Sequence, residues 1–342
     1  MVRVNSSLKA AAWLLLATLC WSVSFTVMRA LVIVQQRAVP GAGTWFIANW
    51  CVALRFGLAA LVVLLWQARS LSRLTRSEIA QGAGLGFFGA GGLVLQMDGL
   101  AYTSASTSAF LTQCYCLMIP LWVAITARRW PPPWVALSCV LVVAGVAILA
   151  GVDWSTFRLG RGELETLLAS VLFTGQILWL QRADYTGNDA NRFSLVMFVV
   201  MALGSAAAAA TSRHAPGDWL RAYATPPTWG FLAVLVVICT LGGYLLMNRW
   251  QTHVTATEAG LIYCAEPVFA SAAALFLPAW FSRWAAIAYP NELLTRNLVA
   301  GGGLVLLANV ILQLAPAGTT APPVAPAAGR QPADGSVLPD HR

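Results

Sequence analysis

The sequence predicts an all-α integral membrane protein in which ten transmembrane helices form two inverted repeats of five. Of its 342 residues, 58% are hydrophobic and only 10% are charged, whereas a soluble domain carries about 25% charged residues. The mean hydropathy is +0.70. The apolar residues also come in long runs, and a run of 18 or more residues is typical of a helix that crosses a bilayer. So few charges cannot build a water-soluble surface.

Each expected span has roughly 19–24 residues, which at 1.5 Å per residue matches a hydrocarbon core of about 30 Å. The expected spans are 11–33, 45–67, 79–101, 105–127, 133–151, 163–181, 193–211, 229–249, 258–281 and 296–314. The connections are short and carry turn signals such as Pro40-Gly41 and Pro226-Pro227. Residues 315–342 are rich in proline and alanine, which predicts a disordered tail.

Basic residues between the spans predict that both termini lie in the cytoplasm. With the N-terminus inside, the inner segments hold ten Lys or Arg residues and the outer segments hold eight. Basic residues near span ends are enriched on the cytoplasmic side, and the clusters at 69–76 and 128–129 carry most of this signal. High alanine content with a single lysine, Lys9, is typical of a GC-rich bacterial genome. The expected location is therefore the inner membrane of a bacterium, as a multi-pass protein.

Similar features recur in the two sets of five spans. The first span ends in Arg29-Ala30 and the sixth is followed by Arg182-Ala183, while Pro120 in the fourth span corresponds to Pro267 in the ninth. Because five is odd, a second copy starts from the opposite side of the membrane, and such inverted repeats place a binding site near the midplane. Residues 1–151 and 163–314 are the expected repeats. The alternative is that any two apolar helices look alike.

Several functions are disfavoured. The net charge of +8 belongs to span ends rather than to a basic soluble fold, so no nucleic-acid partner is expected. The seven cysteines lie in apolar runs without a CxxC pair, which predicts neither a metal site nor disulfides. Gly84, Gly86 and Gly89 match GxGxxG but lack the preceding strand, so they indicate close helix packing together with Gly82. We expect no cofactor and no enzymatic activity, since the catalytic motifs and the P-loop are absent.

Charges inside the expected spans are the strongest indication of a site, because burying one costs about 3 kcal/mol or more. Arg55 lies in the middle of the second span, where it either pairs with a carboxylate, meets an anionic substrate, or anchors backbone carbonyls. Glu266 precedes Pro267 and is a candidate for binding a cation or a coupling proton, or for pairing with Arg55. Asp98 lies near the end of the third span and is a weaker candidate.

Polar and aromatic residues at mid-span depth are expected to line a cavity for an amphipathic small molecule. The site candidates of this kind are Trp21, Asn49, Gln96, Gln113, Tyr115, Gln176, Trp179, Asn248 and Tyr263, with Ser22 and Thr112 beside them. Most other tryptophans lie near span ends, where they are typical interface anchors.

Two long stretches resemble the drug/metabolite transporter superfamily, specifically its EamA-type transporters. They are Gln96 to Pro120, which contains Tyr102-Thr103-Ser-Ala-Ser, and Gln251 to Phe269, which contains Glu266-Pro267-Val-Phe. Trp21 in the first span and Leu54-Arg55-Phe56 in the second extend the resemblance. It implies ten helices in two inverted halves and a transport function. The sequence departs from the family where Gly-Glu-Arg usually follows the fourth and ninth spans. Ala127-Arg128-Arg129-Trp130 follows the fourth span, and an amphipathic piece at 280–288 is expected between the ninth and tenth spans.

These observations favour a secondary transporter, an exporter of small metabolites, amino acids or drugs that works by alternating access. Its expected partners are a small-molecule substrate, membrane lipid and a coupling ion such as H⁺, with homodimerisation left open. A membrane scaffold or accessory subunit without transport activity is the alternative, and an integral-membrane enzyme ranks last.

Overall fold

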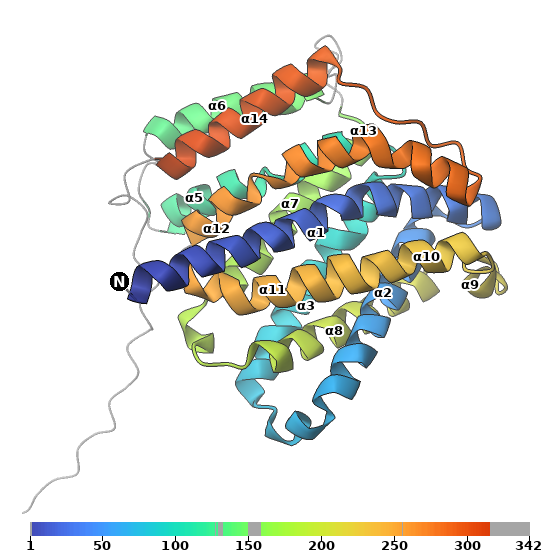
Figure 1. Ribbon diagram of the computed structural model, residues 1–342, viewed down its shortest axis with the longest axis horizontal. Coiled ribbons are helices and arrows are strands. Elements are labelled where there is room, and N and C mark those ends of the chain that lie inside the picture. Colours follow the sequence, from blue (N-terminus) through green and yellow to red (C-terminus); the bar gives the residue numbers. More distant parts are fainter. Residues whose placement is uncertain (1, 127, 129–132, 150–158, 255, 315–342) are drawn as a thin grey trace, which may run out of the picture.

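The computed structural model describes residues 2–126, 128, 133–149, 159–254 and 256–314. Within these residues all regular structure is helical, and the helices pack into one bundle (Figure 1). The expected disordered tail, and the expected span ends at 127 and 151, lie outside the described residues.

The helices of the first half are α1 (Val2–Ala38), α2 (Thr44–Gln67), η1 (Ala68–Arg73), α3 (Arg76–Gly99), α4 (Ala105–Thr112), α5 (Tyr115–Thr126) and α6 (Pro133–Leu149). Those of the second half are α7 (Arg161–Leu180), η2 (Ala183–Tyr185), α8 (Ala190–Ala210), α9 (Asp218–Arg221), α10 (Pro226–Val234), η3 (Leu235–Gly242), α11 (Gly243–Trp250), η4 (Gln251–His253), α12 (Ala256–Tyr263), α13 (Glu266–Ala285) and α14 (Arg296–Leu314).

Where the structure describes them, the ten predicted spans fall mainly on helices, and six helical segments of the described residues are long and apolar enough to cross a membrane. These six are Lys9–Ala38, Thr44–Gln67, Arg76–Gly99, Arg161–Leu180, Ala190–Ala210 and Pro226–His253. Large apolar side chains also face outward, including Leu65 at 71%, Phe87 at 68% and Phe276 at 71% exposed. A soluble protein rarely exposes so much apolar surface, so the bundle is built for lipid.

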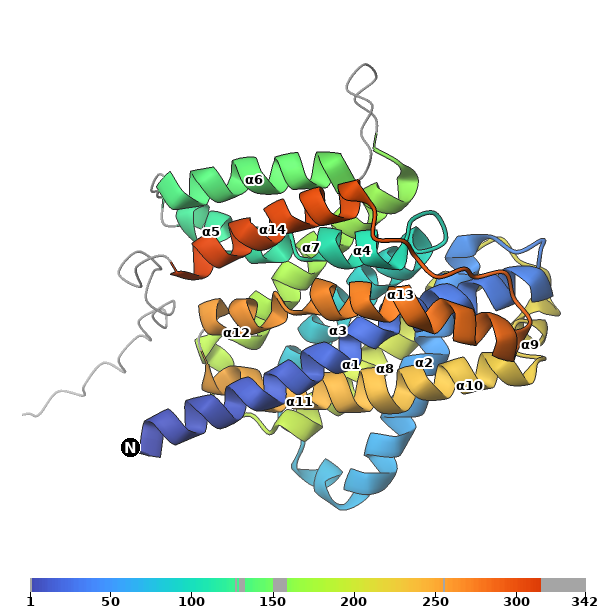
Figure 2. The ribbon, with the colours of Figure 1, turned by 45° about the horizontal axis from the view of Figure 1, so that its top comes forward.

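The bundle has a core and one peripheral pair. α1 packs against α13, α11, α10 and η3, while α3 packs against α7 and α8, and α2 against α8. α6 and α14 pack chiefly against each other and lie along one edge of the molecule in both views (Figures 1 and 2). Ser138 of α6 donates a hydrogen bond from Oγ to the carbonyl oxygen of Ala308 in α14, at 3.1 Å.

The fourth and ninth predicted spans are each divided in two. α4 ends at Thr112 and α5 begins at Tyr115, while α12 ends at Tyr263 and α13 begins at Glu266. In the ninth span the cause is Pro267, which has no N–H and whose ring clashes with the carbonyl four residues earlier, at Tyr263. Neither break was predicted in position, because a single apolar run covers each span. The two breaks lie at corresponding places in the two halves of the chain.

A stretch of π-helix interrupts the eighth span. η3 covers Leu235–Gly242, between α10 and α11. In a π-helix the backbone hydrogen bonds join residues i and i+5 instead of i and i+4. Such stretches are rare and often occur at functional sites. Thr240, within this stretch, is fully buried and accepts a hydrogen bond from Arg55.

The ninth span also runs further than expected. The sequence predicts a separate amphipathic piece at 280–288, but α13 continues without interruption to Ala285 and contains Pro278. Ala286 then adopts a left-handed conformation with φ of 51° and ends the helix. The prediction was wrong because the last turns pack: Trp284 contacts Phe231 of α10 with ring centroids 4.9 Å apart.

Glycines allow close approach of α3 to its neighbours, as the sequence predicts. A Cβ atom at Gly82 would lie 2.5 Å from the carbonyl oxygen of Phe193 and 2.6 Å from Cβ of Val196, both on α8. Backbone atoms cannot move aside as a flexible side chain can. Close backbone contact of this kind favours helix association in lipid. The hydrophobic effect does not contribute there, because the apolar side chains are already out of water.

Replacing Gly82 with alanine should therefore destabilise the bundle by about 1–3 kcal/mol, the usual cost of overpacking. The matched control is Gly204→Ala in α8, because no heavy atom lies within 4 Å of a Cβ atom there. The measurement is the temperature at which the detergent-solubilised protein loses its monodisperse peak in fluorescence-detected size-exclusion chromatography. Equal melting temperatures for the two variants would contradict the packing argument.

Candidate functional site

The two helix breaks are joined by a hydrogen bond between their polar side chains. Gln113, which follows α4, donates from Nε2 to Oε2 of Glu266, the first residue of α13, at 3.0 Å. Gln113 is fully buried and Glu266 is 6% exposed. At the first position of a helix the dipole favours a negative charge, and the described residues include no basic side chain in ion-pair contact with Glu266. This carboxylate is therefore held by a neutral amide and a helix end.

Two further contacts hold this link in place. Gln113 Nε2 also lies 3.3 Å from the hydroxyl oxygen of Tyr115 at the start of α5. Ser22 of α1 donates from Oγ to the backbone carbonyl oxygen of Glu266, at 3.0 Å. Three predicted site residues, Gln113, Tyr115 and Glu266, thus come together with Ser22, from three parts of the chain that are far apart in sequence.

Aromatic rings form one wall beside the link. The Trp21 ring contacts the rings of Tyr244 and Tyr263, with centroids 5.5 and 5.6 Å apart. Gly243 permits this contact, because a Cβ atom there would lie 2.3 Å from Nε1 of Trp21. That Nε1 is buried and has no hydrogen-bond partner among the described residues. An unused donor beside a carboxylate and aromatic rings is suited to holding a polar group of a bound molecule.

Arg55 lies deep in the bundle, with 1% exposure. Its Nε donates to Oγ1 of Thr240 in the π-helix, and its Nη1 lies 3.7 Å from Sδ of Met28. Its guanidinium also lies over the Phe56 ring. None of the ion pairs among the described residues includes Arg55, so the expected pairing with Glu266 is not present. The alternative interpretation, in which Arg55 binds backbone carbonyls, is not seen either. Among the described residues the contacts of Arg55 are to side chains.

The aromatic wall connects the two buried charges. Phe56, beneath the Arg55 guanidinium, contacts Tyr244 with ring centroids 5.6 Å apart, and Tyr244 contacts Trp21. We call Trp21, Gln113, Tyr115, Tyr263, Glu266, Ser22, Tyr244 and Arg55 the central cluster. Tyr244 was missed in the sequence, although a tyrosine after Gly242-Gly243 in an apolar span is a usable signal.

Other predicted residues lie outside the central cluster. Gln96 donates from Nε2 to Oγ1 of Thr112 at 2.9 Å, and so fixes α3 to α4 just before the break. Asn49 bonds the carbonyl oxygen of Trp45 in its own helix at 2.9 Å, which satisfies it locally. Asn248 donates from Nδ2 to Ser194 Oγ at 2.8 Å.

Gln176 and Trp179 face α3 instead. Gln176 Nε2 lies 3.4 Å from the carbonyl oxygen of Leu85, and Trp179 Nε1 donates to the carbonyl oxygen of Gln81 at 3.2 Å. Both contacts join α7 to the backbone of α3. These two residues hold helices together in this conformation.

Asp98 belongs to a polar network at the other end of α3. It is buried and paired with Arg161 at the start of α7. Arg161 also binds Glu165 Oε1 at 2.8 Å and donates to the hydroxyl oxygen of Tyr102 at 2.8 Å. The sequence missed these partners of Asp98, because they lie more than sixty residues further along the chain.

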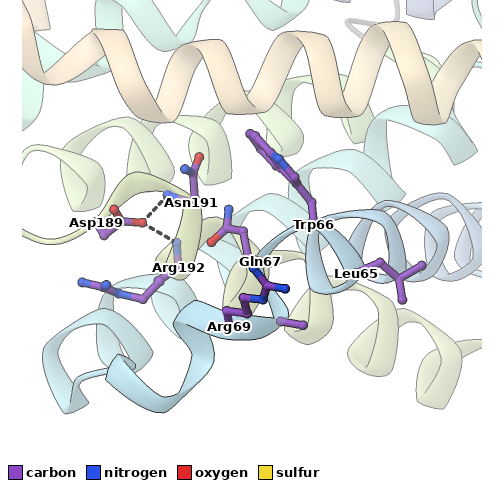
Figure 3. Close-up of a pocket in the computed structure, with 8 residues that line it drawn as sticks. Leu65, Trp66, Gln67, Arg69, Asp189, Asn191 and Arg192 are labelled. Carbon is purple, nitrogen blue, oxygen red and sulfur yellow. Dashed lines mark hydrogen bonds between the residues drawn. The ribbon is translucent and has the colours of Figure 1, made fainter.

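A separate cavity of about 520 Å³ lies where α2 ends and α8 begins (Figure 3). Its lining residues are Leu65, Trp66, Gln67, Ala68, Arg69, Asp189, Asn191 and Arg192. Asp189 caps α8 by accepting from the backbone N–H groups of Asn191 and Arg192, at 3.1 and 3.0 Å. No residue that lines this cavity belongs to the central cluster.

Comparison with known proteins identifies the family. The model of the EamA-like transporter family matches twice, over residues 8–151 and 161–289. No curated protein matches the chain. A solved structure described as "Crystal structure of protein" is 14% identical and has a TM-score of 0.48. The match covers 85% of this chain and 95% of the other chain, and it supports no inference about function.

The two family matches cover most of the chain, and the helices, the apolar exterior and the central cluster are all those of a membrane protein. The chain belongs to the EamA-like transporter family.

Proposed function

We propose that this protein is a secondary transporter of the cytoplasmic membrane that exports small metabolites, amino acids or drugs by alternating access. The observation that carries the proposal is the hydrogen bond between Gln113 and Glu266, which joins two divided spans at the centre of the bundle. Divided helices whose ends meet at mid-membrane depth are a recurring design for transporter binding sites. In this proposal the spans number ten, and both termini are cytoplasmic.

The pattern of helix contacts supports two repeats. If each of the first five spans corresponds to the span five places later, α1 corresponds to α7, and α3 to the helical run α10–α11. The contact of α1 with α11 then corresponds to that of α7 with α3. The contact of α1 with α12 corresponds to that of α7 with α4, and the contact of α1 with α13 to that of α7 with α5. The contacts of α2 with α8 and of α6 with α14 each correspond to themselves. A two-fold axis through the breaks would produce this pattern.

The central cluster suggests the kind of substrate. It offers a carboxylate, a guanidinium without a carboxylate partner among the described residues, and four aromatic side chains. Such a set suits a small molecule that carries both an apolar body and charged or polar ends, as amino acids do. Glu266 is the proposed residue for a substrate cation or a coupling proton, and Arg55 for an anionic group.

The test compares extracellular metabolites of cells that express the wild type or Glu266→Gln at matched membrane levels. Glutamine keeps the shape of the side chain but removes the charge, so compounds that the wild type exports should fall at least about tenfold outside the variant cells, a loss of about 1.4 kcal/mol in the transport step. Purified protein in liposomes would then be tested on each such compound.

Asp184→Asn is the matched control, because Asp184 is an exposed carboxylate that pairs only with Arg182 at the surface. It should leave the extracellular profile as in the wild type. Profiles that are the same for wild type, Glu266→Gln and empty vector would count against export. A scaffold without transport activity would then be the better interpretation.

A further inference from the structure

We propose that Asp98 and Glu165 together bind one proton, in a site separate from Glu266. The site lies where α3 ends and α7 begins, at the end of the bundle reached by the C-terminus of α1 (Figure 2). With both termini cytoplasmic, this is the outer end. The proton site itself rests on geometry, whereas its outward orientation rests on the function proposed above.

The core of the site is one guanidinium between two carboxyl groups. Arg161 donates from Nη2 to Oδ2 of Asp98 and from Nε to Oε1 of Glu165. The side chain of Asp98 is 0% exposed, that of Glu165 is 13% exposed and that of Arg161 is 51% exposed. Two carboxyl groups are therefore held together out of water, while the guanidinium connects them to the surface.

Each carboxyl group has one oxygen left over. Asp98 Oδ1 and Glu165 Oε2 are both buried and accept no hydrogen bond from the described residues. The two groups bind adjacent nitrogens, Nε and Nη2, of the same guanidinium, but two ionised carboxylates have no proton to share. Leaving a buried acceptor unsatisfied costs about 1–3 kcal/mol, and more for a charged group. A single proton between Oδ1 and Oε2 would satisfy both oxygens at once.

The charge balance requires the same proton. Two carboxylates and one guanidinium leave a net charge of −1 in a buried place, and like charges in one site disfavour double ionisation. Tyr102 also contacts Arg161: its hydroxyl oxygen accepts a hydrogen bond from Nη1 at 2.8 Å, and its ring lies 4.4 Å from the guanidinium carbon.

The remaining charged groups nearby are otherwise engaged. Glu163 accepts a hydrogen bond from Thr103 at 2.7 Å. On the side of α1, Arg29 donates to the carbonyl oxygen of Leu100. Glu292 caps α4 through the N–H of Ala105 at 2.8 Å. Among the described residues, the ion-pair partner of both Asp98 and Glu165 is Arg161.

Binding and release of this proton would act on the contact between α3 and α7. With the proton in place, Asp98 and Glu165 attract one another through it and Arg161 holds both. When the proton leaves, the two carboxylates repel and the start of α7 is pushed from the end of α3. Acid outside the cell therefore favours the closed outer end, which is the direction required for proton-driven export.

The experiment is an infrared pH titration of the full-length protein in lipid nanodiscs, which detects the carbonyl band of protonated carboxylic acids and needs no substrate. In Glu165→Gln, the amide can donate to Asp98 Oδ1 as a protonated glutamate would, so this variant should fold normally. We expect it to titrate one carboxyl group fewer than the wild type, and Asp98→Asn to do the same. Monodisperse size-exclusion profiles establish that both are folded.

Glu163→Gln is the matched control, since Glu163 lies on the same turn but binds Thr103, and it should keep the titrating band. Glu266→Gln should keep it too, which separates this site from the transport proposal: loss of transport with an intact band would leave the proton site standing. A band that persists in Glu165→Gln and Asp98→Asn would overturn the proposal. So would displacement of the proton by sodium but not by choline at equal ionic strength, which would indicate a metal cation.

Discussion

Replacing Arg55 with methionine should leave the bundle at least as stable as the wild type while reducing transport at least about tenfold. Arg55 is 1% exposed and contacts only neutral partners among the described residues, namely Thr240, Met28 and Phe56. A cation out of water costs several kcal/mol unless a partner compensates it, and apolar replacement of buried charges is often neutral or stabilising by 1–4 kcal/mol, as a rough range.

Such a residue persists in a lipid-embedded bundle because it does something other than stabilise it. An anionic group of the substrate would supply the missing partner during transport, and methionine cannot bind it. The two measurements are the melting temperature in detergent and the export of whichever compound the metabolite comparison identifies.

Arg55→Lys is the informative control, because it keeps the charge but loses the planar donor set of the guanidinium. It should retain part of the transport activity. If Arg55→Met transports normally, the guanidinium has no role in binding. If instead it is strongly destabilised, Arg55 is a structural anchor through Thr240, and the anion-binding role is wrong.

Replacing Glu78 with alanine should produce the largest loss of stability among the carboxylates outside the central cluster. Glu78 is 1% exposed and accepts hydrogen bonds from the backbone N–H groups of Thr75 at 2.9 Å and Asp189 at 3.0 Å. It forms a capping box with Thr75 at the start of α3 and also binds the Arg192 side chain of α8. One carboxylate therefore satisfies the starts of two helices and ties them together.

The loss expected is about 1.5–3 kcal/mol for each of the two backbone contacts, the range for a hydrogen bond to a charged group. Thermal unfolding in detergent measures it. Glu78→Gln should be intermediate, since an amide oxygen still accepts but carries no charge. Asp184→Ala, which removes an exposed ion pair, should change stability little. A melting temperature for Glu78→Ala equal to that of Asp184→Ala would contradict this account.

The candidate site could be predicted only in part. Glu266, Gln113, Tyr115, Tyr263 and Trp21 were found because polar and aromatic residues at mid-span depth are rare in lipid and need a reason. Nothing in the sequence distinguished them from Asn49 or Gln176, which are also polar residues at mid-span depth. The distinction depends on which way each side chain turns: Asn49 satisfies itself on its own helix, and Gln176 on the backbone of α3.

The sequence by itself determined that the chain is helical and membrane-embedded, because that follows from local composition: long apolar runs, charges at their ends, and glycines where helices must approach. It also indicated the family, through short motifs that precede Pro120 and surround Pro267. Only the tertiary structure decided which polar residues meet. It placed Gln113 on Glu266, separated Arg55 from its expected carboxylate, and brought Glu165 and Arg161 to Asp98. Those outcomes depend on how the helices rotate and cross when they pack. The packing is set by contacts between side chains that are distant in the chain, and local sequence does not reveal those contacts.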